Sequence, residues 1–293
     1  MDTNISKLRE KTISAILAKQ DDSFRWGYNE KQAGERPEYL YYSPNFKSTL
    51  WTLVFLADLK APLDLPQINA SLQLIAAHFY DPESGIYRLP NMSHFPIPCL
   101  NGNMLYLHNY FETSHPEALQ KIIAFFAHFQ RFDDGDYETP KSYPYCSNTS
   151  CYGAHSCYWG VIKLLKGISF LPKNHRTIES QNLVENCIEF ILQHEVCFSS
   201  HKKDRFLRDE ISRLTFPNFY KSDFLEILWL LKREAVHDPR MARSLTFLRS
   251  AMKDNGTWEL EKTMNTIVFI GQKWHTNVFI TERATEVLDY YGH

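Results

Sequence analysis

A turn that leads into an apolar helix occurs twice in this chain, and this repeated pattern constrains the fold more than any other feature. Residues 43–51 read Ser-Pro-Asn-Phe-Lys-Ser-Thr-Leu-Trp, and residues 216–224 read Phe-Pro-Asn-Phe-Tyr-Lys-Ser-Asp-Phe. Each copy places Pro-Asn-Phe and then Lys-Ser before apolar residues at helical spacing. Proline disfavours helix before it, and Ser48 or Ser222 can cap the first free backbone amides. The pattern therefore predicts that a helix follows each copy.

Further helices alternate between mainly apolar and amphipathic segments. The apolar helices are predicted at 50–59, 101–110, 156–168, 224–233 and 279–290, about 50 to 60 residues apart, which is the spacing of two-helix repeats. The amphipathic helices are predicted at 5–19, 65–79, 116–130, 177–194 and 239–252. Three amphipathic helices end in an Asp/Asn-rich stretch followed by Gly, one residue and an aromatic residue, at Gly85, Gly135 and Gly256. Glycine supplies the positive φ that stops a helix.

This alternation predicts an all-α protein with two concentric layers of helices, closed or nearly closed into an α/α toroid. We expect one domain over residues 1–293, in which residues 1–40 form an N-terminal helix and lead-in. Residues 41–293 then contain the helical-hairpin repeats.

The motifs at these helix ends resemble a known repeat. Phe247-Leu248, Met252 and Gly256-Thr257-Trp258 are similar to the Gln-Trp repeat of triterpene cyclases, with Met252 in place of glutamine. Residues 125–137 are similar, with one residue inserted. Over residues 40–290 the chain resembles the α/α-toroid superfamily of squalene-type cyclases and protein prenyltransferase β subunits. The resemblance implies a large hydrophobic, isoprenoid substrate in a central cavity. The acidic motifs Asp-x-Asp-Asp and Asp-Asp-x-x-Asp are absent, so the resemblance predicts fold better than chemistry.

Zinc is implied by a second part of the resemblance. The prenyltransferases bind zinc with Asp-x-Cys-Tyr at a helix start and a later His-Thr. Here His155-Ser-Cys157-Tyr occupies such a start, and His275 precedes threonine ahead of the last helix. His155 stands where the prenyltransferase motif has aspartate, and imidazole is also a zinc ligand. The predicted metal ligands are Cys151, His155, Cys157 and His275. The alternative is that the reduced cysteines pack as small apolar side chains.

Two further groups are candidate catalytic residues. Cys157 lies in the first turn of a predicted helix, where backbone amides favour a thiolate, and His155 could assist it as a nucleophile. Asp223 opens another predicted helix and could act as an acid or bind a polar head group, although capping of that helix explains it more simply. Glu259 and Glu261 could form a carboxylate pair, but surface ion pairing is the simpler interpretation.

Aromatic residues on the apolar helices are the candidate substrate-binding groups, because ring faces stabilise cations and stack on bound groups. They are Trp51, Tyr106, Tyr158, Trp159 and Tyr220.

Charge and cysteine content narrow the class of protein. The chain has 32 basic and 34 acidic residues, a net charge of −2, and no basic stripe of the kind that binds nucleic acid. No segment is apolar enough to span a membrane, and the N-terminus lacks a secretory signal. Six cysteines without regular spacing favour a reducing compartment, so we expect a cytoplasmic protein.

Three functions remain open at this point. The first is an isoprenoid-binding protein like a terpenoid cyclase or prenyltransferase, a transferase with zinc in one version, whose site a partner chain could complete. The second is a carbohydrate-active (α/α) barrel enzyme, which would need two facing carboxylates. The third is a non-catalytic scaffold that binds a lipid or a protein partner.

Overall fold

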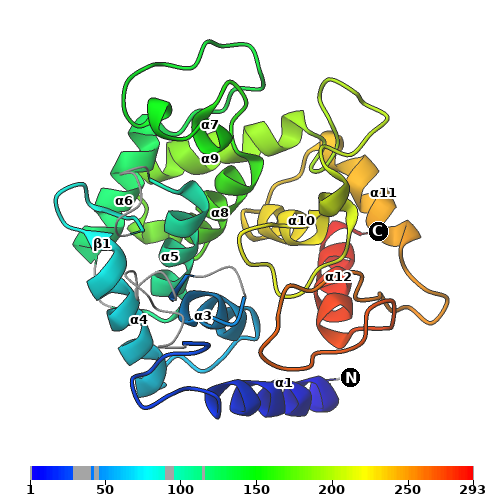
Figure 1. Cartoon of the computed structure of the whole chain (residues 1–293). Helices are drawn as coiled ribbons and strands as arrows, with labels where there is room; N and C mark the ends of the chain where they lie inside the picture. The colour runs from blue at the N-terminus through cyan, green and yellow to red at the C-terminus, as the bar shows by residue number, and fades with distance from the viewer. Residues whose placement is uncertain (1, 29–40, 43–45, 90–95, 114–115, 293) are drawn as a thin grey trace. The chain divides into compact units, whose positions relative to one another are not determined.

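Helices dominate the described structure, a computed structural model that covers residues 2–28, 41–42, 46–89, 96–113 and 116–292 (Figure 1). The predicted all-α class is therefore confirmed. The segment Ser43-Pro44-Asn45 of the first repeated motif lies outside the described residues, as does most of the predicted lead-in. The α-helices are α1 (Asp2–Leu17), α3 (Thr49–Asp58), α4 (Pro66–Phe79), α5 (Pro98–Tyr110), α6 (Pro116–Phe129), α7 (Thr149–Tyr152), α8 (Tyr158–Ser169), α9 (Ile178–Gln193), α10 (Phe224–Arg233), α11 (Ala242–Ser250) and α12 (Val278–Tyr291).

Short elements join these helices. The strands β1 (Tyr80–Asp81) and β2 (Ile86–Tyr87) form an antiparallel pair in which Tyr80 lies opposite Tyr87. Single turns of 3-10 helix are η2 (Tyr145–Ser147), η3 (Lys173–His175), η4 (Asp209–Ser212) and η5 (Pro239–Met241). Proline occupies the first turn of α4 and of α5, where the missing N–H removes no helical hydrogen bond.

The predicted alternation of apolar and amphipathic helices agrees with burial. Every residue of α3 is buried, and so are most residues of α5, α8 and α10. The helices between them bury one face, as α4 does with Ile68, Leu72, Ile75 and Phe79. A helix that is apolar on all sides is stable only when other elements surround it, so the buried helices depend on their neighbours.

The chain divides into two compact units, with the boundary inside α9. Unit 1 contains residues 1–18 and 188–293, and unit 2 contains residues 19–187. In unit 1, α10 packs against α11 and α12, and Arg9 of α1 forms an ion pair with Glu282 of α12 at 2.7 Å. The sequence predicts that these two units belong to a single domain, and this stays a prediction.

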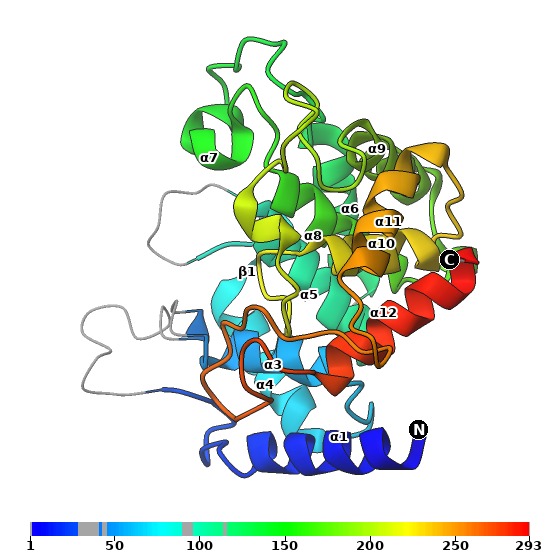
Figure 2. The same cartoon turned by 90° about the vertical axis from the view of Figure 1, so that its right-hand side faces the viewer.

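Unit 2 is organised around the close packing of α5 on α8, which lie side by side in Figures 1 and 2. A Cβ atom on Gly102 would lie 2.3 Å from the backbone of Lys163, and one on Gly167 would lie 2.5 Å from Leu105. Only glycine permits the two helices to approach this closely. Asn109 strengthens the contact by donating a hydrogen bond to the carbonyl of Gly167 at 2.9 Å.

The three predicted glycine turns are present. Gly85, Gly135 and Gly256 all have positive φ, at 72°, 104° and 75°. A fourth turn of the same kind escaped the sequence pattern because Phe24, with φ 60°, takes the place of glycine two residues before the buried Trp26.

A hydrogen bond ties the segment before each apolar helix to the start of that helix. A side chain there accepts from a backbone N–H of the preceding segment. The pairs are Trp26 with Thr49, Tyr87 with Asn101, Asp133 with Ser156, Thr215 with Asp223, and Trp258 with Thr281. The repeat therefore extends beyond the helices to the way each connection is held.

Candidate functional site

A hollow in unit 2 lies at the C-terminal end of α5. Two adjoining cavities of about 200 Å³ and about 590 Å³ share the lining residues His108, Glu112 and Thr113, and we call them together the α5 pocket. The larger one has the size of a small-molecule site. The smaller is completed by Asn69, Leu72, Gln73, Ala76 and Phe111, and the larger by Asn109, Pro116, Leu119, Gln120, Phe170, Leu171, Pro172 and His175.

His108 connects two hydroxyl groups at the wall of this pocket. Its Nε2 atom is 2.7 Å from the Tyr87 hydroxyl, and its Nδ1 atom is hydrogen bonded to the hydroxyl of Thr113. His108 and Tyr87 are buried, whereas Thr113 is half-buried and lines both cavities. The imidazole therefore connects an interior hydroxyl to one that faces the pocket.

Local structure fixes the positions of Tyr87, His108 and Thr113, the three residues that these hydrogen bonds connect. Tyr87 follows the Gly85 turn, and its backbone exchanges two hydrogen bonds of 2.8 Å with the side chain of Asn101 in α5. Beyond α5, Glu112 adopts a φ of 52°, and the amide of Thr113 donates to the carbonyl of His108 at 3.1 Å. This 6→1 bond is that of a Schellman motif, here without glycine at the left-handed position. The helix end thus turns Thr113 back onto His108.

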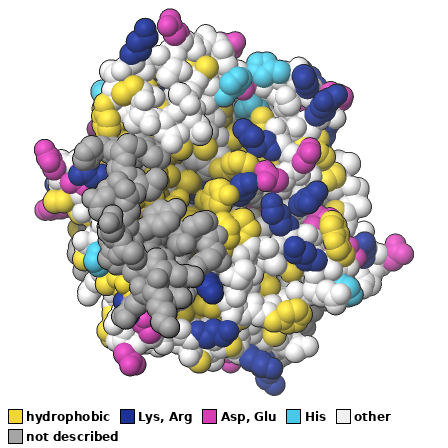
Figure 3. Space-filling model, in the orientation of Figure 1, with side chains coloured by type: hydrophobic (Ala, Val, Ile, Leu, Met, Phe, Trp, Pro, Cys, Tyr) yellow, Lys and Arg dark blue, Asp and Glu magenta, His cyan; other side chains and the backbone are white. Residues whose placement is uncertain are grey.

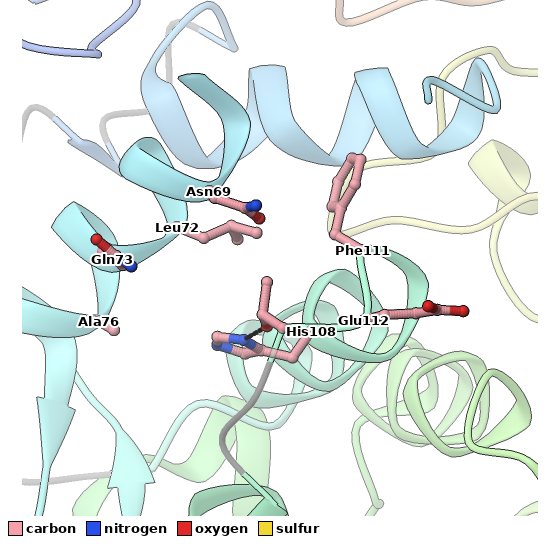
Figure 4. A pocket seen from close by; sticks show the side chains of 8 residues that line it. Asn69, Leu72, Gln73, Ala76, His108, Phe111 and Glu112 are labelled. Atoms are coloured by element: carbon pink, nitrogen blue, oxygen red, sulfur yellow. Dashed lines mark hydrogen bonds between the residues drawn. The ribbon is translucent and has the colours of Figure 1, made fainter. Parts of the chain in front are cut away.

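Asn69 lines the same pocket and carries a polar atom without a partner among the described residues. Its Oδ1 atom is buried and has no hydrogen-bond partner among the described residues. Figure 4 shows Asn69 and Leu72 extending from α4 toward the space beside His108 and Phe111. Buried polar groups are nearly always hydrogen bonded, because an unmade bond costs about 1–3 kcal/mol. A ligand hydroxyl could supply the missing partner.

Burial determines the protonation state of Tyr87, which lies beside the pocket. Burial raises the pKa of Tyr87 well above its ordinary value, so this residue is a neutral hydroxyl that can donate or accept. A neutral histidine has one donor and one acceptor nitrogen, so either tautomer of His108 satisfies both neighbours. The two tautomers differ in the direction of these hydrogen bonds, and Tyr87 stays a neutral hydroxyl in both.

A buried ion pair lies behind the apolar wall of the pocket. Lys166 of α8 and Asp58 of α3 are 2.7 Å apart, and Tyr106 of α5 donates to the same Asp58 oxygen at 3.1 Å. The Tyr106 ring packs edge-on against Phe170, with centroids 4.7 Å apart, and Phe170 lines the pocket. The predicted residue Tyr106 thus contributes to the support of the pocket wall, one layer away from the cavity.

The structure brings the predicted thiols together. Cys157 is the N-cap residue of α8, Cys151 lies in α7, and a hydrogen bond joins their side chains. That bond and burial raise the pKa of the Cys151 thiol. Cys99, in the first turn of α5, is close enough to both thiols to influence their charge.

The two predicted histidine ligands, His155 and His275, are both exposed. The His155 side chain is 66% exposed, and its Nδ1 atom is 3.5 Å from an Asp134 carboxylate oxygen. In the described part of the chain, Cys151, His155 and Cys157 do not place three ligand atoms within 4.8 Å of one another. His275 belongs to unit 1, is exposed, and lies 3.0 Å from the carbonyl of Lys273. Within unit 2 the three predicted ligands therefore do not converge, and zinc binding stays a prediction.

Asp223 is the N-cap residue of α10 in unit 1. Its two oxygens accept from the backbone amides of Glu226, at 2.8 Å, and Thr215. Burial raises the pKa of Asp223 to about 7. Asp223 rather than Ser222 is thus the cap of α10, and Ser48 makes no side-chain cap bond at α3. The capping interpretation of Asp223 is confirmed.

The candidate carboxylate pair is explained by local contacts. Glu261 accepts from the amide of Leu214 at 2.8 Å, and Glu259 pairs with Lys253 at 3.1 Å.

The predicted aromatic residues do not line the α5 pocket in the described structure. Trp51 and Tyr158 are buried, and Trp51 donates from its indole nitrogen to the carbonyl of Tyr42 at 2.9 Å. Trp159 and Tyr220 are half-buried, with Tyr220 in unit 1. Their role in substrate binding stays a prediction.

Sequence reasoning missed His108 and Asn69. Each lies on a helix that was predicted, but a single histidine or asparagine gives no motif. The available signal was the Gly85 turn, which identified Tyr87 as a residue that packs back into the fold.

The comparisons with known proteins leave the family open. The chain matches no protein-family model, no curated protein and no solved structure. Among the described residues, no helix has both the length and the apolar character that crossing a bilayer requires. Acidic and basic side chains occur side by side on the face drawn in Figure 3, in keeping with the mixed charge of the sequence.

Proposed function

We propose that unit 2 binds a small apolar molecule that bears a hydroxyl group, of the isoprenoid alcohol class, in the α5 pocket. The observation that carries this proposal is Asn69, which lines the pocket and whose buried Oδ1 atom has no hydrogen-bond partner among the described residues. A hydroxyl can donate and accept, so it can pair with the Asn69 amide in either orientation of the amide.

The rest of the lining supports the same ligand class. Leu119, Phe170 and Leu171 offer an apolar surface for a hydrocarbon chain, whereas His108 and Thr113 adjoin Asn69 at the polar end. Ligand pockets usually combine a largely apolar wall with a few polar groups that fix orientation. The apolar wall and the polar end of the pocket, together with the sequence resemblance, favour a ligand of the isoprenoid class.

His108 gives the site a role beyond lining the pocket. A base within hydrogen-bond reach of a hydroxyl can accept its proton, and Thr113 connects His108 to the pocket. In this proposal His108 fixes the orientation of the Thr113 hydroxyl, and Thr113 in turn orients the ligand hydroxyl.

The test is titration of the full chain with farnesol and with the hydrocarbon farnesene, followed by calorimetry. We expect saturable binding and a preference for farnesol of about tenfold, the value of one good hydrogen bond. Asn69→Leu should abolish the preference while binding of farnesene persists. Asn182→Leu, which makes the same change at an exposed position of α9, should leave the preference intact. Equal affinity for both probes in the unmodified chain would contradict the proposal.

We propose the toroid architecture because the helical repeat runs along the chain. Each apolar helix follows an amphipathic one, and the segment before each apolar helix is tied to its start in the same way. Such repeats can close into an α/α ring, and an experimental structure of the full chain would test this.

The other functions have weaker support. Zinc binding by Cys151, His155, Cys157 and His275 stays a prediction, which metal analysis of untagged protein would test. For the carbohydrate-active alternative, Glu112 is the one carboxylate in the described lining of the α5 pocket, whereas acid–base hydrolysis needs two.

A further inference from the structure

A tight loop holds two cysteines of unit 2 next to each other. Tyr152 and Ser156 form an isolated antiparallel bridge, so the chain reverses between them. Cys151 and Cys157 are the residues just outside this bridge. Each cysteine is bonded directly to a residue of the bridge, so the reversal brings the backbones of Cys151 and Cys157 close to each other. The backbone therefore places the two thiols together.

Hydrogen bonds to the segment that contains Asp133 and Gly135 also hold this loop in place. The amide of Ser156 donates to the carbonyl of Asp133 at 2.8 Å, and the amide of Gly135 donates to the carbonyl of Ala154 at 3.1 Å. Ser156 in turn accepts from the amide of Asp133 through its hydroxyl at 2.9 Å. Because these bonds hold the loop, the proximity of the cysteines does not depend on side-chain motion alone.

The two thiols also interact directly. A side-chain hydrogen bond joins Cys151 to Cys157, and both residues are half-buried, so a small oxidant can reach them. Cys157 is the N-cap residue of the twelve-residue helix α8, and Cys151 belongs to α7. Of the other cysteines, Cys146 is exposed, Cys187 and Cys197 are buried, and Cys99 is half-buried like the pair.

We propose that Cys151 and Cys157 are a modification site that a hydroperoxide converts into a reversible intrachain disulfide. The Cys157 thiolate attacks one peroxide oxygen, the O–O bond breaks, and the released hydroxide takes up a proton to form water. This step leaves a sulfenic acid on Cys157. Cys151 then attacks that sulfur, the S–O bond breaks, and hydroxide leaves with the Cys151 proton as a second water. Two thiols and one peroxide thus give a disulfide and two waters, and a small dithiol reverses the reaction.

The test uses the reduced, metal-free full chain treated with limiting hydrogen peroxide, then alkylated and digested with chymotrypsin under non-reducing conditions. Cleavage after Tyr152 separates the two cysteines, so a disulfide appears as two linked peptides that dithiothreitol releases. We expect this species to dominate, with Cys146 still open to alkylation. A disulfide that instead includes Cys99, or oxidation spread evenly over the exposed thiols, would overturn the proposal.

Two variants separate the steps. In Cys151→Ser, the sulfenic acid on Cys157 cannot be resolved by its partner, so dimedone labelling of Cys157 should rise well above that of the unmodified chain. Cys146→Ser, the matched change at an exposed cysteine, should leave both the disulfide and the labelling unchanged. Circular dichroism of each variant checks that the helices are retained. Failure of dimedone labelling to rise in folded Cys151→Ser would show that Cys157 is not the residue attacked.

Discussion

Lys166 and Asp58 form an ion pair of 2.7 Å in the interior of unit 2, with side chains that are 0% and 1% exposed. The pair joins α8 to α3, and Tyr106 of α5 completes it with a hydrogen bond to Asp58 and a ring 4.1 Å from the Lys166 Nζ atom. Three buried helices therefore meet at one set of charges. The Tyr106 ring also packs edge-on against Phe170, which lies in the wall of the α5 pocket.

Replacement of one member should be strongly destabilising. Lys166→Met leaves the Asp58 carboxylate buried without its cation, which costs about 3–5 kcal/mol in free energy of unfolding. The double variant Asp58→Leu with Lys166→Met removes both charges and should recover much of that loss. Urea unfolding of the three proteins measures the difference, and a double variant as unstable as the single one would contradict this account.

Asp223 should make unit 1 lose stability as pH rises. Burial raises its pKa from the ordinary 3.8 to about 7, so between these values the folded state keeps a proton that the unfolded state releases. The contribution of Asp223 to stability is therefore greatest below pH 4 and falls up to pH 7, by about 3 kcal/mol between pH 5 and pH 8. Its charged neighbours are Glu226, which raises this pKa, and Arg283, which lowers it.

Asp223→Asn tests this sign, because asparagine cannot ionise. Urea unfolding at pH 5 and pH 8 should show that the unmodified chain loses about 3 kcal/mol more than the variant over that interval. Parallel pH profiles for the two proteins would show that Asp223 is charged in the folded chain at both values.

Gly102→Ala should disrupt the packing of α5 on α8. The new Cβ would lie 2.3 Å from backbone atoms of Lys163, so the helices must separate, at a cost of about 1–3 kcal/mol or more. Gly256→Ala is the control, because nothing lies within 4 Å and only the positive φ is strained. That strain is worth about 1–2 kcal/mol. Thermal unfolding should rank Gly102→Ala as the more damaging change, and the reverse order would count against the close helix contact.

Tyr87→Phe should weaken the chain of hydrogen bonds at His108. The substitution leaves the buried Nε2 atom without its hydroxyl partner, which costs about 1–3 kcal/mol. Tyr80→Phe removes a hydroxyl from the neighbouring, half-buried ring and should cost much less. Chemical unfolding of both variants provides the comparison, and equal losses would indicate that the Tyr87–His108 contact contributes little.

The helices were predictable because apolar periodicity, prolines and glycine turns are local signals. Helix α4, for example, begins at Pro66 and ends at Phe79, within a residue of the prediction. The turn at Trp26 was missed because Phe24 adopts a backbone conformation usually reserved for glycine.

The site was less predictable because it depends on contacts between separate elements. Asn69, Tyr87 and His108 come from α4, β2 and α5, and no spacing in the sequence brings them together. The cysteine prediction succeeded in part for the opposite reason: Cys151 and Cys157 are six positions apart, and a local loop joins them.

The most direct test of the proposed function is a crystal structure of the full chain with farnesol. We predict electron density for the probe in the α5 pocket, with its hydroxyl within hydrogen-bond distance of Asn69 and its chain along Phe170. Density for the probe at any other place, with the Asn69 amide still unpartnered, would contradict the account.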